Sequence, residues 1–191
     1  METAQKILNS AEALIQKHGF SGFSFQDIAD EIGIRKASIH YHYPAKADLG
    51  RAVIQRYRTR MAEVGNSLDL KEDGLNHWQA LALYLEPIVQ LGRTPGHACL
   101  CGVLGGEYLS LPDAMQAEIA GYFDEQITWL TDLLDSGRAA GAFRFHGSAG
   151  EMARLLFGAI EGGLLIKRTT GDIEFIDRIL TTAQALLGGE P

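Results

Sequence analysis

Residues 35–43 read RKASIHYHY and bring several kinds of hydrogen-bond donor together. Lys36 can donate to a guanine edge or to a phosphate, and His40, Tyr41 and His42 can donate to phosphate oxygens while adding little charge. Ala37 and Ser38 are small, so they would let the backbone come close to base edges. The set suits contact with double-stranded DNA, to which Arg35 would add a cation. The alternative is a solvated helical surface with no partner.

The surrounding sequence predicts a helix-turn-helix that would present these side chains. Ser24 and Asp27 form a capping pattern that opens a helix over residues 25–32. Gly33 suits a left-handed turn, and a second helix over about 35–42 must stop before Pro44. The inner face would be formed by Ile28, Ala29, Ile32, Ile39 and Tyr43.

The segment from His97 to Cys101 holds a second group of reactive side chains. Cys99 and Cys101 stand two residues apart on a predicted helix, so they would point about 200° apart and would not share a metal ion. A thiol near a helix N-terminus that senses electrophiles or oxidants is an alternative. The simplest interpretation is two small, partly buried residues, in a protein of the reducing cytoplasm.

Charge is distributed unevenly along the 191 residues, whose formal net charge is -7. Residues 1–60 hold nine Lys/Arg and six Asp/Glu, whereas residues 61–191 hold eight Lys/Arg and eighteen Asp/Glu. A basic head on an acidic body favours contact with a polyanion at one end only. Chance asymmetry would give the same pattern.

Hydrophobic periodicity predicts an all-α chain with about nine helices. The predicted spans are 3–18, 25–32, 35–42, 46–64, 74–91, 96–109, 112–137, 148–169 and 173–187. We expect a helix-turn-helix domain over residues 1–46 and a larger helical bundle over residues 47–191. The sequence contains no apolar run long enough to cross a membrane. It also lacks the dinucleotide, P-loop, esterase and metalloprotease motifs, so we expect no enzyme activity, no cofactor and no metal.

The stretch from Ile7 to Ile54 resembles the TetR/AcrR family of bacterial transcriptional repressors. The residues that carry the resemblance are FSFQDIADEIGIRKASIHYHYPAKADL, preceded by a helix that ends in HGF. The resemblance implies a repressor that binds a palindromic operator as a homodimer and is released by a small molecule.

The resemblance also assigns roles to single residues. Lys36, Ala37 and Ser38 match the base-reading positions, and His40, Tyr41 and His42 match phosphate contacts. Ser24 would hold a phosphate at the start of its helix, and Lys46 would add charge at the start of the fourth helix. The family often has glycine where Ala37 stands. The extra methyl group of Ala37 would shift the approach of this helix to the DNA groove by about its own width.

Small and apolar residues near the C-terminus predict a helix–helix interface. Glycine within a helix costs about 1 kcal/mol relative to alanine, and close approach of another helix would offset that cost. We expect two helices from each of two chains to meet here. The interface residues would include Leu155, Gly158, Gly162, Leu165, Ile176 and Leu180. The alternative is a core within one chain.

A ligand site in the larger helical bundle, over residues 47–191, is predicted with less definite residues. Its candidate residues are Trp78, Tyr84, Cys99, Glu107, Tyr108, Trp129, Phe157 and Glu161. If Glu107 or Glu161 is buried, a cationic or hydrogen-bond-donating ligand is favoured. Either acid would instead be solvated on an exposed face. A protein that binds DNA without any ligand is the competing function.

Overall fold

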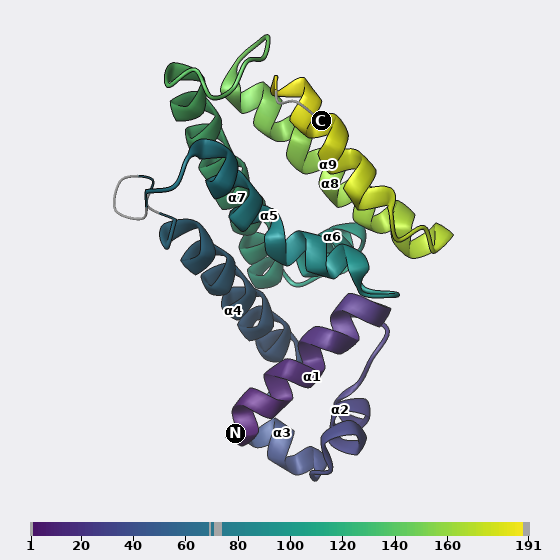
Figure 1. Cartoon of the computed structure of the whole chain (residues 1–191). Helices are drawn as coiled ribbons and strands as arrows, with labels where there is room; N and C mark the ends of the chain where they lie inside the picture. Colours follow the sequence, from purple (N-terminus) through teal and green to yellow (C-terminus); the bar gives the residue numbers. More distant parts are fainter. Residues whose placement is uncertain (1, 69, 71–73, 189–191) are drawn as a thin grey trace. The chain divides into compact units, whose positions relative to one another are not determined.

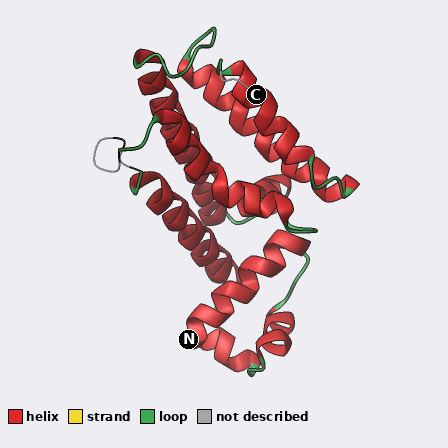
Figure 2. Ribbon diagram, in the orientation of Figure 1, coloured by secondary structure: helices red, strands yellow, loops and turns green. Residues whose placement is uncertain are grey.

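Every regular element in the described part of the chain is a helix (Figure 2). The computed structural model describes residues 2–68, 70 and 74–188. These residues form α1 (Thr3–His18), α2 (Phe25–Ile32), α3 (Lys36–His42), α4 (Lys46–Asn66), α5 (His77–Arg93), α6 (Leu100–Gly106), a 3-10 turn (Tyr108–Ser110), α7 (Asp113–Ala139), α8 (Ala149–Thr170) and α9 (Phe175–Leu186). The predicted all-α class is confirmed.

The predicted helix over residues 96–109 is wrong at its beginning. Gly96 adopts a positive φ of 73°, and α6 begins only at Leu100. The Lys167 ammonium holds this non-helical segment by donating to the carbonyls of Thr94 (2.5 Å), Leu91 (3.2 Å) and His97 (3.4 Å). Cys99 therefore lies before α6, so the two cysteines do not share one helix as the spacing argument assumed.

The chain forms two compact units. The first contains residues 1–60 and 100–122, and the second contains residues 61–99 and 123–191. The first unit thus includes α6 and the start of α7 as well as the helix-turn-helix. The predicted boundary at residue 46 divides the chain by function, into a DNA-binding part and a ligand-binding and dimerisation part. That functional division stays a prediction.

The first unit packs α1 against α2, α3 and α6. Its core is apolar, with Ile7, Ile28 and Ile39 fully buried. Beside this core, the half-buried Glu12 of α1 pairs with Arg56 and Arg60 of α4, each at 2.6 Å. The α2 and α3 helices are thus held against α1, and α1 is joined to α4 by ion pairs.

The second unit contains α8 and α9 side by side, and α5 contacts both (Figure 1). A Cβ atom at Gly163 would lie 2.3 Å from Ile179 Cδ1, and one at Gly92 would lie 3.0 Å from Ile176 Cγ1. Glycine at both positions therefore permits close packing against α9. None of the described helices is long and apolar enough to span a membrane.

Candidate nucleic-acid interface and buried polar cluster

The connection between α2 and α3 has the geometry of a helix-turn-helix. The Ser24 hydroxyl accepts from the backbone N–H groups of Gln26 (3.2 Å) and Asp27 (3.4 Å), and the Asp27 carboxylate accepts from Ser24 N at 2.6 Å. Gly33 ends α2 in the left-handed region, with φ 68° and ψ 39°. The predicted cap and turn are confirmed.

The α3 helix buries one side chain and exposes most of the others. Ile39 is fully buried, while Tyr41 keeps 85% of its surface exposed. Arg35, Lys36, Ala37 and His40 are exposed, and Ser38 and His42 are half-buried. An exposed tyrosine beside exposed cations is a surface available to a polyanion.

Ring contacts hold the histidines of α3. The His40 ring packs edge-on against Phe25, with centroids 4.8 Å apart, and its Nδ1 lies 3.4 Å from Pro44 O. The His42 ring packs against Tyr41 at 5.2 Å. Such contacts restrict the side-chain rotamers before any partner is bound.

Lys46 has a different environment from the one expected of a phosphate contact. Its ammonium donates to the carbonyls of Phe20 (2.5 Å) and Phe23, and it lies over both rings at 4.6 and 4.2 Å from their centroids. Burial lowers the pKa of Lys46. The structure gives this side chain a role in holding the loop between α1 and α2, and its phosphate contact stays a prediction.

Glu107, the residue that follows α6, holds the same loop. Its carboxylate accepts from Phe20 N (2.7 Å), Ser21 N (2.9 Å) and the Ser21 hydroxyl (2.6 Å). Gly19 permits this approach, because a Cβ there would lie 2.1 Å from Glu107 Oε1. Glu107 therefore belongs to the unit that contains the helix-turn-helix, where its oxygens already have donors. Its predicted ligand contact is untested.

Ser24 is also engaged within the chain. Its hydroxyl and its backbone N–H both donate to Asp27, which lowers the pKa of that carboxyl. A phosphate at this position would have to displace the Asp27 carboxylate. The proposed phosphate contact of Ser24 remains a prediction.

Four of the predicted ligand residues form a buried polar cluster in the second unit, consisting of Tyr84, Cys99, Trp129 and Glu161. Tyr84 is buried, stacks on Trp129 with centroids 3.8 Å apart, and donates its hydroxyl to Gln126 Oε1 at 2.5 Å. Burial raises the pKa of Tyr84 most, and the nearby Cys99 and Glu161 raise it further.

Glu161 is the unusual member of this cluster. Both of its carboxylate oxygens are buried and lack a hydrogen-bond partner among the described residues. Burial raises the pKa of Glu161 to about 7, and the neighbouring Cys99 thiol opposes part of that rise. Cys99 is itself buried, and neither it nor Cys101 forms a disulfide.

The remaining ligand candidates lie elsewhere. Trp78 donates its indole N–H to Ala142 O at 3.1 Å and packs edge-on against Phe143. Phe157 is buried and meets Phe123 edge-on at 6.1 Å. Tyr108 is half-buried in the first unit, with Glu107.

The predicted interface residues divide between a surface and a core. Leu155 and Leu165 are 56% and 41% exposed, and a Cβ at Gly158 or Gly162 would meet nothing within 4 Å. Leu180 is half-buried. Ile176, by contrast, is 1% exposed and belongs to the core of the unit. The surface that remains open is therefore on α8.

Sequence reasoning gave no role to the loop residues Phe20 and Ser21. The HGF segment marked the end of a helix, but nothing local pointed to Glu107 as the partner of the loop, because Glu107 lies 86 residues after Ser21. Gln126 was also missed, because one glutamine in a long amphipathic helix carries no signal.

The comparisons with known proteins agree with this geometry. The model of bacterial regulatory proteins of the tetR family matches residues 7–53. The HTH-type transcriptional repressor DhaR of Mycobacterium sp. strain GP1 is 23% identical over 96% of this chain and 91% of its own length. IcaR of Staphylococcus aureus, the negative regulator of the biofilm operon icaADBC, is 25% identical over 63% of this chain and 69% of its own.

Solved structures match nearly the whole chain. A TetR transcriptional regulator from Legionella pneumophila is 32% identical, has a TM-score of 0.88 and covers 98% of both chains. A TetR family regulator from Agrobacterium tumefaciens is 28% identical with a TM-score of 0.88, covering 96% of this chain and 97% of its own. With these matches and the exposed α3 helix, the chain belongs to the TetR family of DNA-binding transcriptional regulators.

Proposed function

We propose that this protein is a dimeric repressor that binds a palindromic operator through α3 and leaves it when a small molecule binds the second unit. The observation that carries the proposal is the capped helix-turn-helix with Lys36, Ala37, His40 and Tyr41 exposed on α3. Lys36, Ala37 and Ser38 would read bases, and His40, Tyr41 and His42 would bind phosphates.

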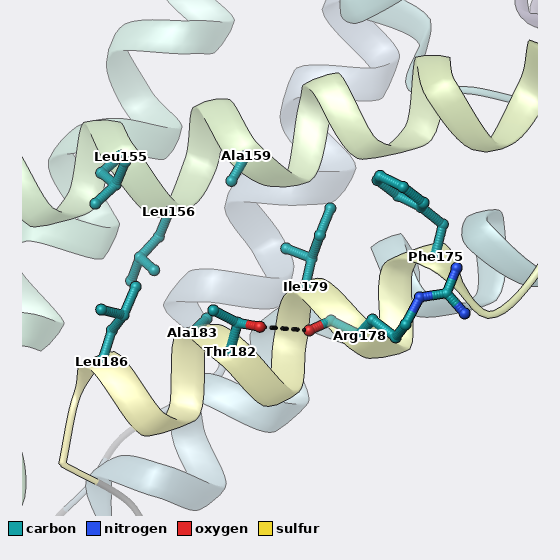
Figure 3. A pocket seen from close by; sticks show the side chains of 9 residues that line it. All are labelled: Leu155, Leu156, Ala159, Phe175, Arg178, Ile179, Thr182, Ala183 and Leu186. Atoms are coloured by element: carbon teal, nitrogen blue, oxygen red, sulfur yellow. Dashed lines mark hydrogen bonds between the residues drawn. The ribbon is translucent and has the colours of Figure 1, made fainter.

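The dimer would form through α8 and α9. Between these helices lies an apolar groove of about 260 Å³, with Leu155 and Leu156 on one side and Phe175, Ile179 and Leu186 on the other (Figure 3). Leu155, Leu165, Ile166 and Leu186 each expose over 40% of their surface. Covering such a surface with a second copy would remove apolar area from water and leave room for close contact at Gly158 and Gly162.

Repression and release would follow from a population shift between two dimer forms. One form would space the two α3 helices about 34–36 Å apart, to match successive major grooves. A small molecule that binds the other form more tightly would reduce operator affinity by the ratio of its two binding constants. Within the buried polar cluster, both oxygens of the Glu161 carboxylate are buried with no N–H or O–H partner among the described residues, and this supports an effector site there.

Selection of bound sequences from random duplexes, followed by affinity measurements, tests the DNA-binding part. We expect one palindromic sequence to be enriched. Ser38→Ala and Lys36→Ala should alter the preference at one or two positions of each half-site, by about 1–3 kcal/mol per base contact. Arg144→Ala, which removes an exposed cation from the second unit, is the matched control and should bind like the wild type.

Failure to enrich any sequence would contradict the proposal. Equal base preference in the wild type and in both α3 variants would contradict the assignment of α3 as the reading helix.

A further inference from the structure

The donor that lowers the pKa of Glu161 is the weakly donating thiol of Cys99, and neither carboxylate oxygen has an N–H or O–H partner among the described residues. Both of these oxygens are buried. Such groups are rare in folded proteins, because desolvation without a compensating bond is costly. A water molecule or a ligand must therefore satisfy this side chain when it is ionised.

Among the described residues, no cation contributes to the pKa shift of Glu161, and Tyr84, one of its neighbours, carries an aromatic ring. The titratable groups that interact with it are Cys99, before α6, and Tyr84, on α5. Lys167, on the same helix, directs its ammonium to backbone carbonyls at the end of α5. An ionised carboxylate in this cluster would therefore be buried without a countercharge, which is the more costly state of a buried acid.

The rings of Tyr84 and Trp129 complete the chemistry of the cluster. They are stacked within 14° of parallel with centroids 3.8 Å apart, so each ring covers one face of the other and only the outer faces are left for another contact. Trp129 is half-buried, and its Nε1 lies 2.7 Å from where a Cβ at Gly65 would stand. Aromatic faces attract organic cations through the ring quadrupole, and more strongly when the site is desolvated.

We propose that Glu161 is the anchor of the effector site and that the effector is an organic cation, whose ammonium or amidinium group pairs with the Glu161 carboxylate while its apolar part lies against Tyr84 and Trp129. This inference rests on the proposed function, since it names the class of molecule that releases the repressor. A cation supplies both the missing hydrogen-bond donors and the missing countercharge, whereas a neutral donor supplies only the first.

Calorimetry and thermal unfolding at about pH 8, where Glu161 is ionised, test the proposal. The probes are phenethylammonium and benzamidinium, with phenethyl alcohol and benzamide as their neutral counterparts. We expect each cation to raise the Tm of the wild type more than its neutral counterpart does, since it binds only the folded state. Glu161→Gln should bind the cations about ten- to hundredfold more weakly.

The matched control is Asp132→Asn, which removes an exposed carboxylate from α7 of the same unit and should leave cation binding unchanged. Equal binding of the cations to the wild type and to Glu161→Gln would overturn the proposal. So would equal effects of the cations and their neutral counterparts, or a crystal structure with saturating cation in which only water contacts Glu161.

The outcome is separable from that of the proposed function. A wild-type protein that binds its selected operator but shows no Glu161-dependent cation binding would remain a repressor and would overturn the cation inference. A protein that binds cations through Glu161 but enriches no operator would overturn the proposed function instead.

Discussion

Glu161 imposes a pH-dependent cost on folding. Burial raises its pKa from the ordinary 4.5 to about 7 in the folded protein, so between these values the folded state holds a proton that the unfolded state has lost. The free energy of unfolding therefore falls as pH rises from about 4.5 to 7 and stays low above that range. Over this whole pH interval, the free energy of unfolding falls by about 3 kcal/mol.

Replacing Glu161 by glutamine should remove this dependence. Urea unfolding at about pH 8 should show Glu161→Gln to be more stable than the wild type by up to about 3 kcal/mol, and near pH 4, below both pKa values, the difference should nearly vanish. Asp132→Asn should show the wild-type dependence. A glutamine variant that is less stable than the wild type at pH 8 would mean that the ionised carboxylate has donors in solution.

Lys46 can be distinguished from Lys36 by the salt dependence of operator binding. Lys36 is exposed on α3, so Lys36→Ala removes one cation from the surface proposed to face DNA and should reduce the slope of log affinity against log salt by about 1. Lys46 donates to the carbonyls of Phe20 and Phe23, so Lys46→Ala should leave the slope unchanged. It should instead lower the free energy of unfolding by about 1–3 kcal/mol and weaken operator binding.

The salt titration is made by fluorescence anisotropy, and the stability by urea unfolding. A Lys46→Ala variant of normal stability whose salt slope falls by about 1 would identify Lys46 as a phosphate contact.

The loop between α1 and α2 is the element whose position depends most on distant residues. Glu107 accepts three hydrogen bonds from Phe20 and Ser21, and Lys46 binds carbonyls of the same loop. Because the loop leads directly into the Ser24 cap of α2, its position helps to set where the helix-turn-helix begins. Since α6 ends beside Glu107, a change in α6 would reach the loop through this carboxylate.

Glu107→Gln should loosen the loop. A glutamine keeps the shape of the side chain, but it has one acceptor oxygen, and its NH2 group would face backbone N–H donors. We therefore expect the free energy of unfolding to fall by about 1–2 kcal/mol and operator binding to weaken. Ser21→Ala removes a single hydroxyl bond and should have a smaller effect. Hydrogen exchange of the Phe20 and Ser21 amides, measured by NMR, should be faster in Glu107→Gln. Unchanged exchange would show that the carboxylate does not hold the loop.

The helix-turn-helix was predictable because its signals are local. The Ser24 and Asp27 cap, the left-handed Gly33 and the stop before Pro44 all act within a few residues. The beginning of α6 was not predictable, since it depends on Lys167, more than 70 residues from Leu91 and Thr94. Glu107 and Glu161 were both recognised as possible buried acids. Only the tertiary structure separates Glu107, which accepts three hydrogen bonds, from Glu161, whose oxygens accept none from an N–H or O–H group among the described residues.

At the scale of the whole molecule, substitutions at two neighbouring glycines of α8 separate the proposed dimer surface from the core of the single chain. Gly162 has open space around its missing Cβ, whereas a Cβ at Gly163 would meet Ile179. Gly162→Leu should therefore shift the protein from dimer toward monomer while helical content is retained. Gly163→Leu should lower the stability of the single chain by about 1–3 kcal/mol or prevent its folding.

Sedimentation velocity over a range of concentrations, with circular dichroism as the check on folding, measures this contrast. A Gly162→Leu protein with wild-type dimer affinity would place the interface elsewhere. A wild type that is monomeric at micromolar concentration would contradict a dimer formed through α8 and α9.

Two α3 helices of one dimer should read the two halves of a palindromic operator. Hydroxyl-radical footprinting of the wild type on its selected duplex measures this most directly. We expect two protected regions related by the dyad of the palindrome, with centres about one helical turn or a whole number of turns apart, and loss of both in a variant that combines Lys36→Ala with Tyr41→Ala. Protection that is uniform along the duplex, or that persists in this variant, would contradict this expectation.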